Sequence, residues 1–171
     1  MAINWENENL PAIVDTWYGG EYGGLAFAQM LFGEFSPSGR LPLTFYKGVE
    51  QLPPFDDYQV VNGRTYKYLE DTPLYPFGYG LSYTSFEYSD LKVSHRGKNW
   101  KVKFNVTNTG QMASDEVCQV YARIPDYEGK SPIKELKGFA RVSLNPGEKK
   151  AVEVLVPDSK LRYWSETDGK F

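Results

Sequence analysis

Two adjacent acids, Asp56 and Asp57, are the residues of this 171-residue chain whose types first suggest chemistry. Paired carboxylates can act as general acid and base, or can bind a hard cation. Both follow a proline pair, which favours an extended chain because a residue before proline is disfavoured in the helical region. Adjacent residues of an extended chain point to opposite sides. We therefore interpret Asp56 and Asp57 as solvated loop acids rather than as a catalytic pair.

A glycine-rich stretch at residues 19–24 precedes a helical pattern and has the composition of an anion-binding turn. Helix N-termini present free amides to phosphate groups. The glycine spacing matches neither the dinucleotide fingerprint nor the P-loop, and Glu21 would repel a phosphate. A tight turn with close helix packing is the favoured interpretation.

Three further residues could carry chemistry singly. Arg40 follows the turn signal Pro-Ser-Gly, and the sequence leaves open whether it pairs with a carboxylate or caps backbone carbonyls. Cys118 is the single cysteine, so it forms no internal disulfide, and we interpret it as a small residue on a buried strand face. Asn105 begins a glycosylation sequon, but its place in the middle of a predicted strand favours a chance match.

The composition excludes several classes of function. The net charge is −3, and no basic run is long enough for a nucleic-acid footprint, so we expect no nucleic-acid partner. The longest apolar stretch is a few residues, so we expect no membrane span. The first residues lack a basic start and a hydrophobic run, so no signal peptide is visible.

The first 47 residues predict a strand, a helix and a second strand. Residues 11–18 are β-branched and aromatic, which suits a buried strand. Residues 25–32 place their apolar side chains on one helical face, and Gly33 is suited to cap that helix. Residues 41–46 predict another short strand. This pattern is half of a βαβ unit, which we interpret as the end of an α/β domain.

Residues 48–85 predict an extended linker rich in proline, glycine and aromatic residues. Residues 63–68 alternate in polarity and predict a brief edge strand. From residue 73 to residue 88, four prolines and glycines forbid a regular element, while six aromatic rings carry too much apolar area for a free tether. We call residues 73–88 the aromatic seam. We expect its rings to be buried between two domains and its hydroxyls to reach polar partners.

Residues 86–171 predict an antiparallel β-sandwich. Val102, Phe104 and Val106 alternate with polar residues, as do Val152, Val154 and Val156 in a later run. Two more apolar runs lie between them, at residues 118–124 and 136–144, with residues 125–132 as a loop. We expect about six strands, the last beginning at residue 161, against roughly seven in an immunoglobulin-like sandwich. A missing closing strand would leave an open edge.

Several ordered blocks resemble glycoside hydrolase family 3, the β-glucosidase and β-xylosidase family. They are Ala-Ile-Val-Asp-Thr-Trp-Tyr-Gly-Gly-Glu-Tyr-Gly-Gly at residues 12–24, Leu-Phe-Gly at 31–33, Ser-Pro-Ser-Gly-Arg-Leu-Pro at 36–42 and Pro-Leu-Tyr-Pro-Phe-Gly-Tyr-Gly-Leu-Ser-Tyr at 73–83. The blocks at residues 105–110, 116–121, 134–139 and 144–147 are similar to the fibronectin type III-like domain of that family. Gly19 and Ser36 depart from the more usual proline and asparagine, both within turns. The resemblance spans nearly the whole chain.

The resemblance implies the C-terminal part of a retaining β-glycosidase that acts on β-glucosides or β-xylosides. Such an enzyme needs two carboxyl groups about 5 to 5.5 Å apart. No acid here, including Glu6, Glu8 and Glu21, lies in a stretch that matches either catalytic motif of the family. We therefore predict no catalytic, cofactor-binding or metal-binding residue in this chain, no cofactor, and no activity for the chain alone. Its partners would be the remainder of the parent enzyme and that enzyme's substrate.

A non-catalytic carbohydrate-binding or protein-interaction module is the alternative function. Trp17, Trp100 and Trp164 aligned on one exposed face would favour it, because aromatic rings stack on sugars. Rings that are buried and scattered would favour a supporting role. We also expect the first 47 residues to self-associate or to remain partly disordered, because their apolar faces lack the cover of a full sheet.

Overall fold

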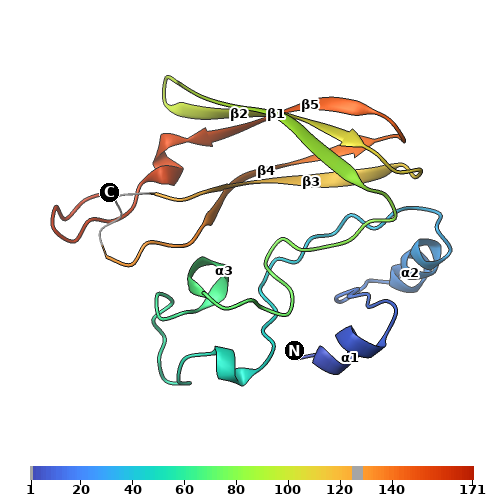
Figure 1. The fold of residues 1–171 in the computed structure, drawn as a ribbon, viewed down its shortest axis with the longest axis horizontal. Coiled ribbons are helices and arrows are strands. Elements are labelled where there is room, and N and C mark those ends of the chain that lie inside the picture. Colours follow the sequence, from blue (N-terminus) through green and yellow to red (C-terminus); the bar gives the residue numbers. More distant parts are fainter. Residues whose placement is uncertain (1, 125–128) are drawn as a thin grey trace.

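The computed structural model describes residues 2–124 and 129–171, and its largest part is an antiparallel β-sandwich. Two sheets face each other as two layers, with the N-terminal helices and loops below the β3–β4 layer (Figure 1). One sheet has the order β1-β2-β5 and the other pairs β3 with β4, all antiparallel. The strands are β1 (Phe86–Arg96), β2 (Asn99–Asn108), β3 (Ser114–Ala122), β4 (Glu135–Leu144) and β5 (Lys149–Pro157). The predicted mixed fold with an antiparallel sandwich is confirmed.

The core lies between the two sheets and follows the predicted alternation. Val102, Phe104 and Val106 of β2 are at most 8% exposed, and their partners in register on β5 include Val152 and Val154, each 5% exposed. The core is completed by Val156, Cys118 and Leu144. Each of these side chains contributes about 1.5 to 3 kcal/mol when fully buried. Cys118 is fully buried, as predicted for a structural cysteine.

The N-terminal part consists of short helices joined by extended chain. These are α1 (Asn4–Asn9), α2 (Gly23–Leu31), η1 (Val49–Gln51) and α3 (Thr65–Tyr68). The predicted helix is confirmed as α2, and Gly33 caps it at φ +75°. The Gly33 N–H bonds to the Met30 carbonyl and the Glu34 N–H to the Gln29 carbonyl, which is the Schellman arrangement. Among the described residues, no helix is long and apolar enough to cross a membrane.

Three predicted strands are not formed. Residues 11–18 form no strand, and Ile13 and Val14 are 40% and 43% exposed. A buried strand needs neighbours on both edges and cover on both faces, and the described chain supplies none at this position. Residues 41–46 make only an isolated bridge, between Phe45 and Tyr75. Within the edge strand predicted at residues 63–68, residues 65–68 form α3 instead, and no described strand pairs with them.

The C-terminal residues also differ from the prediction. The sixth strand expected from residue 161 is absent, and η2 (Asp158–Leu161) follows β5 directly. Beyond it, Ser165 and Lys170 form one isolated bridge. The described sandwich therefore has five strands, because the last apolar run finds no strand to pair with. Within the predicted loop at residues 125–132, residues 125–128 lie outside the described chain.

Candidate functional site

The N-terminal part meets the sandwich along a short ribbon that contains the aromatic seam. The Leu41 N–H donates to the Tyr79 carbonyl at 2.8 Å, and the Gly78 N–H donates to the Leu41 carbonyl at 2.7 Å. At the other end, Phe45 exchanges backbone hydrogen bonds with Tyr75 at 2.9 and 3.2 Å. The turn at residues 37–39 therefore leads into a segment that is tied along its length to the seam.

The rings of the seam pack in small groups. Phe77 stacks on Tyr66 with ring centres 4.2 Å apart, and Tyr121 of β3 meets Phe77 edge-on at 6.5 Å. Tyr75 stacks on Tyr79 at 5.3 Å. Offset and edge-on ring pairs each add about 0.5 to 1.5 kcal/mol beyond their buried area. The contacts among Tyr66, Phe77 and Tyr121 join α3, the seam and the sandwich.

The prediction for the seam is only partly confirmed. Its hydroxyls reach polar partners: Tyr83 donates to the Met30 carbonyl at 3.1 Å, and Tyr75 donates to Asn7 at 2.6 Å. Its rings, however, are not fully buried. Tyr79 is 37% exposed and Tyr83 is 48% exposed. The cover that a complete α/β domain would give is not present in the described chain, and these two rings stay open to solvent.

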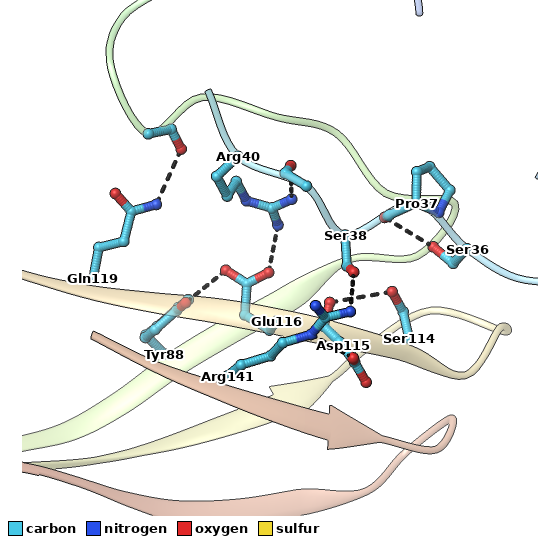
Figure 2. A network of polar contacts seen from close by, with 12 residues as sticks. Ser36, Pro37, Ser38, Arg40, Tyr88, Ser114, Asp115, Glu116, Gln119 and Arg141 are labelled. Atoms are coloured by element: carbon cyan, nitrogen blue, oxygen red, sulfur yellow. Dashed lines mark hydrogen bonds and ion pairs between the residues drawn. The ribbon is translucent and has the colours of Figure 1, made fainter. Parts of the chain in front are cut away.

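A buried ion pair holds the segment at residues 36–41 against the sandwich. Arg40 Nη2 lies 2.5 Å from Glu116 Oε2 of β3, and the side chains are only 12% and 10% exposed. The Tyr88 hydroxyl of β1 donates to the other carboxylate oxygen at 2.7 Å. Arg40 also donates to the Gly39 carbonyl at 2.9 Å. Both roles that the sequence left open for Arg40 are therefore filled at once (Figure 2).

The local electrostatics fit a structural role for these groups. Burial raises the pKa of Tyr88, and its hydrogen bond to Glu116 raises it further, so the phenol stays protonated and donates. Burial likewise raises the pKa of the neighbouring Cys118 thiol. A protonated phenol and an unreactive thiol are suited to packing rather than to nucleophilic attack.

At two glycines of the seam, the backbone lies very close to neighbouring groups. Gly78 adopts φ +82°, and Gln119 donates its side-chain amide to the Gly78 carbonyl at 3.1 Å. A Cβ at Gly80 would lie 2.3 Å from the Gly39 carbonyl oxygen. Figure 2 shows Gln119 and Glu116 on the same strand, reaching the two segments of the ribbon. Glycine is therefore required at both seam positions.

A second ionic group docks α3 on β4. Glu135 accepts from Lys67 at 2.6 Å and from Lys137 at 2.8 Å. Burial alone would raise the pKa of the Glu135 carboxyl, but the two ammonium groups outweigh it and hold the pKa below its usual range. The Leu136 N–H also donates to the Tyr66 hydroxyl at 3.1 Å. The carboxylate stays charged and serves this contact.

A polar pocket of about 400 Å³ lies beside the junction. Arg141 reaches into it, held by Asp115 at 2.6 Å and by the Ser38 hydroxyl at 2.9 Å. Ser143 donates to the same Asp115 carboxylate at 2.5 Å. Asp115 therefore has its lone pairs engaged, and its pKa is lowered chiefly by the Ser143 hydrogen bond. Its lowered pKa and its ion pair with Arg141 make Asp115 a weak base for the Ser143 hydroxyl.

The acids considered from the sequence are spread over separate elements. Glu6 and Glu8 lie in α1, and Glu21 lies in the turn before α2. Asp57 accepts from the Gln59 N–H at 2.9 Å and from Asn62 at 2.7 Å, which organises its own loop. In the part of the chain that the structure describes, no cluster of three or more metal-ligating side chains occurs. The absence of catalytic residues stays a prediction.

The three tryptophans proposed as a binding face belong to three separate places. Trp17 precedes α2 and is 51% exposed. Trp100 lies on β2 against the His95 ring, with ring centres 4.9 Å apart. Trp164 follows η2 and packs edge-on against Phe171 at 5.3 Å. The tryptophans are therefore scattered, as the supporting role predicts, but they are not buried, since Trp100 is 38% exposed and Trp164 51%.

The sequence identified only some of the residues that join the N-terminal part to the sandwich. Arg40 was a candidate, but Glu116 and Tyr88, which complete its network, lie 76 and 48 positions further along the chain. The sequence assigned Glu116 no role beyond its place in the block at residues 116–121. A charged residue at a core-facing strand position is the signal that marks it, because such residues are buried only when they are paired.

Comparison with known proteins gives consistent matches over most of the chain. Residues 1–83 match the glycosyl hydrolase family 3 C-terminal domain, and residues 116–171 match the fibronectin type III-like domain. A xylan 1,4-beta-xylosidase of Xylanibacter ruminicola is 42% identical over 96% of this chain, which covers 19% of that protein. A periplasmic beta-glucosidase of Salmonella typhimurium is 37% identical over 97% of this chain and 24% of its own length.

Solved structures give the same result. A β-glucosidase of Erythrobacter marinus superposes with a TM-score of 0.80 at 41% identity, over 96% of this chain and 22% of the other. The beta-glucosidase 3B of Thermotoga neapolitana in complex with alpha-D-glucose superposes with a TM-score of 0.74 at 38% identity, over 87% of this chain and 23% of the other. The chain thus spans about a fifth of the length of the relatives that it matches.

Proposed function

The chain belongs to glycoside hydrolase family 3, of whose enzymes it corresponds to the C-terminal region, and we propose that it is the supporting part of a β-glycosidase. The enzyme would hydrolyse β-glucosides or β-xylosides, as the names of its relatives indicate for those proteins. We place its two catalytic carboxylates outside residues 1–171. We further propose three units: residues 1–47 as the end of the α/β domain, 48–85 as the packed linker and 86–171 as the fibronectin-like sandwich.

The observation that carries this proposal is the use made of two acids, Glu116 and Glu135, that lie between the N-terminal part and the sandwich. A retaining glycosidase keeps two carboxyl groups free on either side of the sugar, about 5 to 5.5 Å apart. Here the Glu116 carboxylate is occupied by Arg40 and Tyr88, and the Glu135 carboxylate by two lysines. The Glu116 side chain is 10% exposed and the Glu135 side chain 20%, and each joins the N-terminal part to the sandwich. Their arrangement supports a rigid connection rather than a reaction.

Activity assays test the proposal directly. The chain alone should show no turnover of a chromogenic aryl β-glucoside or aryl β-xyloside above the buffer rate. Measurable turnover that survives repurification would show that carboxylates within residues 1–171 are catalytic.

Complementation tests the supporting role. The Erythrobacter marinus β-glucosidase without the region that this chain matches should lose its activity, and adding this chain to it should restore a measurable fraction. A variant with Arg40→Met should restore less at equal concentration, because the junction is weakened, whereas Lys103→Met, which removes an ion pair between β2 and β5, should restore as much as the unchanged chain. If the shortened enzyme keeps full activity without the chain, the supporting role is wrong.

A further inference from the structure

The polar pocket of about 400 Å³ beside the junction is built from four separate stretches of chain. They are the segment at residues 35–38, the start of β3, the end of β4 and the turn that leads into β5. Figure 2 shows Arg141 of β4 bonded to Ser38 of the N-terminal part, so the two parts of the molecule meet at this pocket. Its volume lies within the range of pockets that hold small organic ligands, about 300 to 1,000 Å³.

The charged side chains that line the pocket balance one another. They are two cations and two carboxylates: Arg141, Lys150, Asp115 and Glu148. Arg141 pairs with Asp115 at 2.6 Å, and Lys150 pairs with Glu148 at 3.1 Å. A phosphate group would meet both carboxylates, and a metal cation would meet both positive side chains. The pocket is therefore suited to an uncharged ligand.

Several polar atoms of the lining keep hydrogen-bonding capacity after these internal bonds. Arg141 uses Nε for Asp115 and Nη2 for Ser38, and among the described residues its Nη1 has no partner. Asn145 donates to Glu148 through Nδ2, which leaves its Oδ1 as an acceptor. The Ser38 hydroxyl accepts from Arg141 and can still donate its own proton. Donors and acceptors together suit a ligand that carries several hydroxyl groups, because each hydroxyl can do both.

Part of the lining is apolar. Phe35 lies in the lining and is 43% exposed, so its ring is accessible to a ligand. Ala113 and Leu144 add further apolar surface. A pyranose ring combines a face of C–H groups, which packs against an aromatic ring, with a rim of hydroxyl groups. Both halves of that chemistry have a counterpart in this pocket.

We propose that this pocket binds a neutral saccharide of one or two pyranose rings. The C–H face of one sugar ring would pack on Phe35, and its hydroxyl groups would accept from Arg141 Nη1 and donate to Asn145 Oδ1. The choice of glucose or xylose as the sugar rests on the proposed function, because the relatives are named for both activities. The chemistry of the pocket does not depend on that choice.

Internal hydrogen bonds shape the pocket before any ligand binds. Lys150 Nζ donates to the Ser143 carbonyl at 2.6 Å, and the Asn145 N–H donates to Glu148 at 2.8 Å, so the turn between β4 and β5 is fixed. The bond between Arg141 and Ser38 fixes the segment at residues 35–38 relative to β4. A saccharide would therefore bind with less loss of conformational entropy than at a flexible surface.

NMR titration of the full chain with cellobiose and with xylobiose tests the proposal. The backbone amides of residues 113–115 and 141–145 should shift saturably at millimolar concentrations of at least one disaccharide. Inorganic phosphate and glycerol should give no saturable shift of these amides. The signals of the sugar itself show whether it is cleaved, and cleavage would contradict the proposed inactivity of the chain without contradicting binding.

Matched variants locate the binding. Phe35→Ala should weaken it roughly fivefold or more, because the stacking surface is lost. Phe55→Ala makes the same change at a ring that is 92% exposed and outside the lining, and should alter binding by no more than about twofold. Arg141→Lys keeps the positive charge beside Asp115 but removes the Nη1 donor, and should weaken binding as Phe35→Ala does. Circular dichroism should show the same fold for all three variants.

Three outcomes would overturn the proposal. The first is no saturable shift with either disaccharide, and the second is equal weakening by Phe35→Ala and Phe55→Ala. The third is tighter binding of inorganic phosphate than of both sugars at the same amides, which would make the pocket an anion site. These measurements use the chain alone, whereas complementation uses the shortened enzyme, so the saccharide site and the supporting role can fail independently.

Discussion

At the scale of single residues, the Arg40–Glu116 pair is the contact on which the junction depends most. Its two side chains are nearly removed from water, and its carboxylate is also bonded to Tyr88. A buried pair contributes little compared with two apolar side chains, but losing one partner leaves the other charged and unpaired. The effect of a substitution therefore depends on whether one partner or both are changed.

Arg40→Met should lower the free energy of unfolding by about 3 kcal/mol, because Glu116 keeps a buried charge without its partner. The double variant Arg40→Met with Glu116→Leu should recover part of that loss. Urea denaturation followed by tryptophan fluorescence measures both values.

Lys103→Met is the control, since it removes an ion pair with Glu153 whose lysine side chain is 55% exposed. Such surface pairs contribute about 1 kcal/mol or less. An equal loss for Arg40→Met and Lys103→Met would show that burial of the first pair has no energetic consequence.

The sequence predicted single residues well where the cause is local and poorly where it is not. Cys118 was placed on a buried face because its strand pattern and chemistry agree. Asp57 was placed in a loop because its neighbouring prolines fix the chain. The partner of Arg40 was not identifiable, because ion pairing joins positions that only the folded chain brings together.

At the scale of elements, the aromatic seam connects the N-terminal part to the sandwich because two of its glycines let backbone segments approach closely. Gly80 lies against the Gly39 carbonyl, and Gly78 has a positive φ beside Gln119. The prolines and glycines that prevent a regular helix or strand in the seam therefore also make the close contact possible. They allow residues 41–45 and 75–79 to run side by side.

Gly80→Ala should destabilise the chain by roughly 2 kcal/mol, since its Cβ would overlap a backbone oxygen that cannot move without breaking the ribbon. Gly39→Ala is the matched control, because nothing lies within 4 Å of the Cβ that it adds. Thermal denaturation should show a lower midpoint for Gly80→Ala alone. If the two midpoints fall together, the close approach at Gly80 is not what limits this position.

Elements were predictable from sequence only where their neighbours are in the same chain. The strands of the sandwich form as expected because each apolar face meets another apolar face across the core. The run at residues 11–18 has the same β-branched composition, yet it stays irregular, because strand formation needs a hydrogen-bonding partner. The helix at residues 23–31 forms regardless, since a helix satisfies its own backbone.

At the scale of the whole molecule, the N-terminal part presents an unusual amount of apolar surface to water. Its exposed side chains include Ile13, Val14, Trp17, Leu25, Leu31 and Phe32, the last 87% exposed. Large apolar patches on a soluble chain are sites of contact with another surface. In the proposed enzyme this surface would lie against the remainder of the α/β domain.

The isolated chain should therefore self-associate as its concentration rises, through the N-terminal surface. Size-exclusion chromatography with light scattering should show a mass above that of one chain, and Leu31→Glu with Phe32→Glu should return it toward the monomer. Val93→Lys should leave the mass unchanged, since it alters a different surface. A compact monomer at every concentration would contradict this expectation.

The contact between seam and sandwich also has a consequence for protein engineering. Arg40, Gly80 and Glu116 come from three stretches of sequence but form one fitted contact. Chimeras that exchange only the fibronectin-like domain between family members would combine β3 of one enzyme with the ribbon of another. The smallest unit that can be transplanted intact is therefore the domain together with residues 36–45 and 73–88.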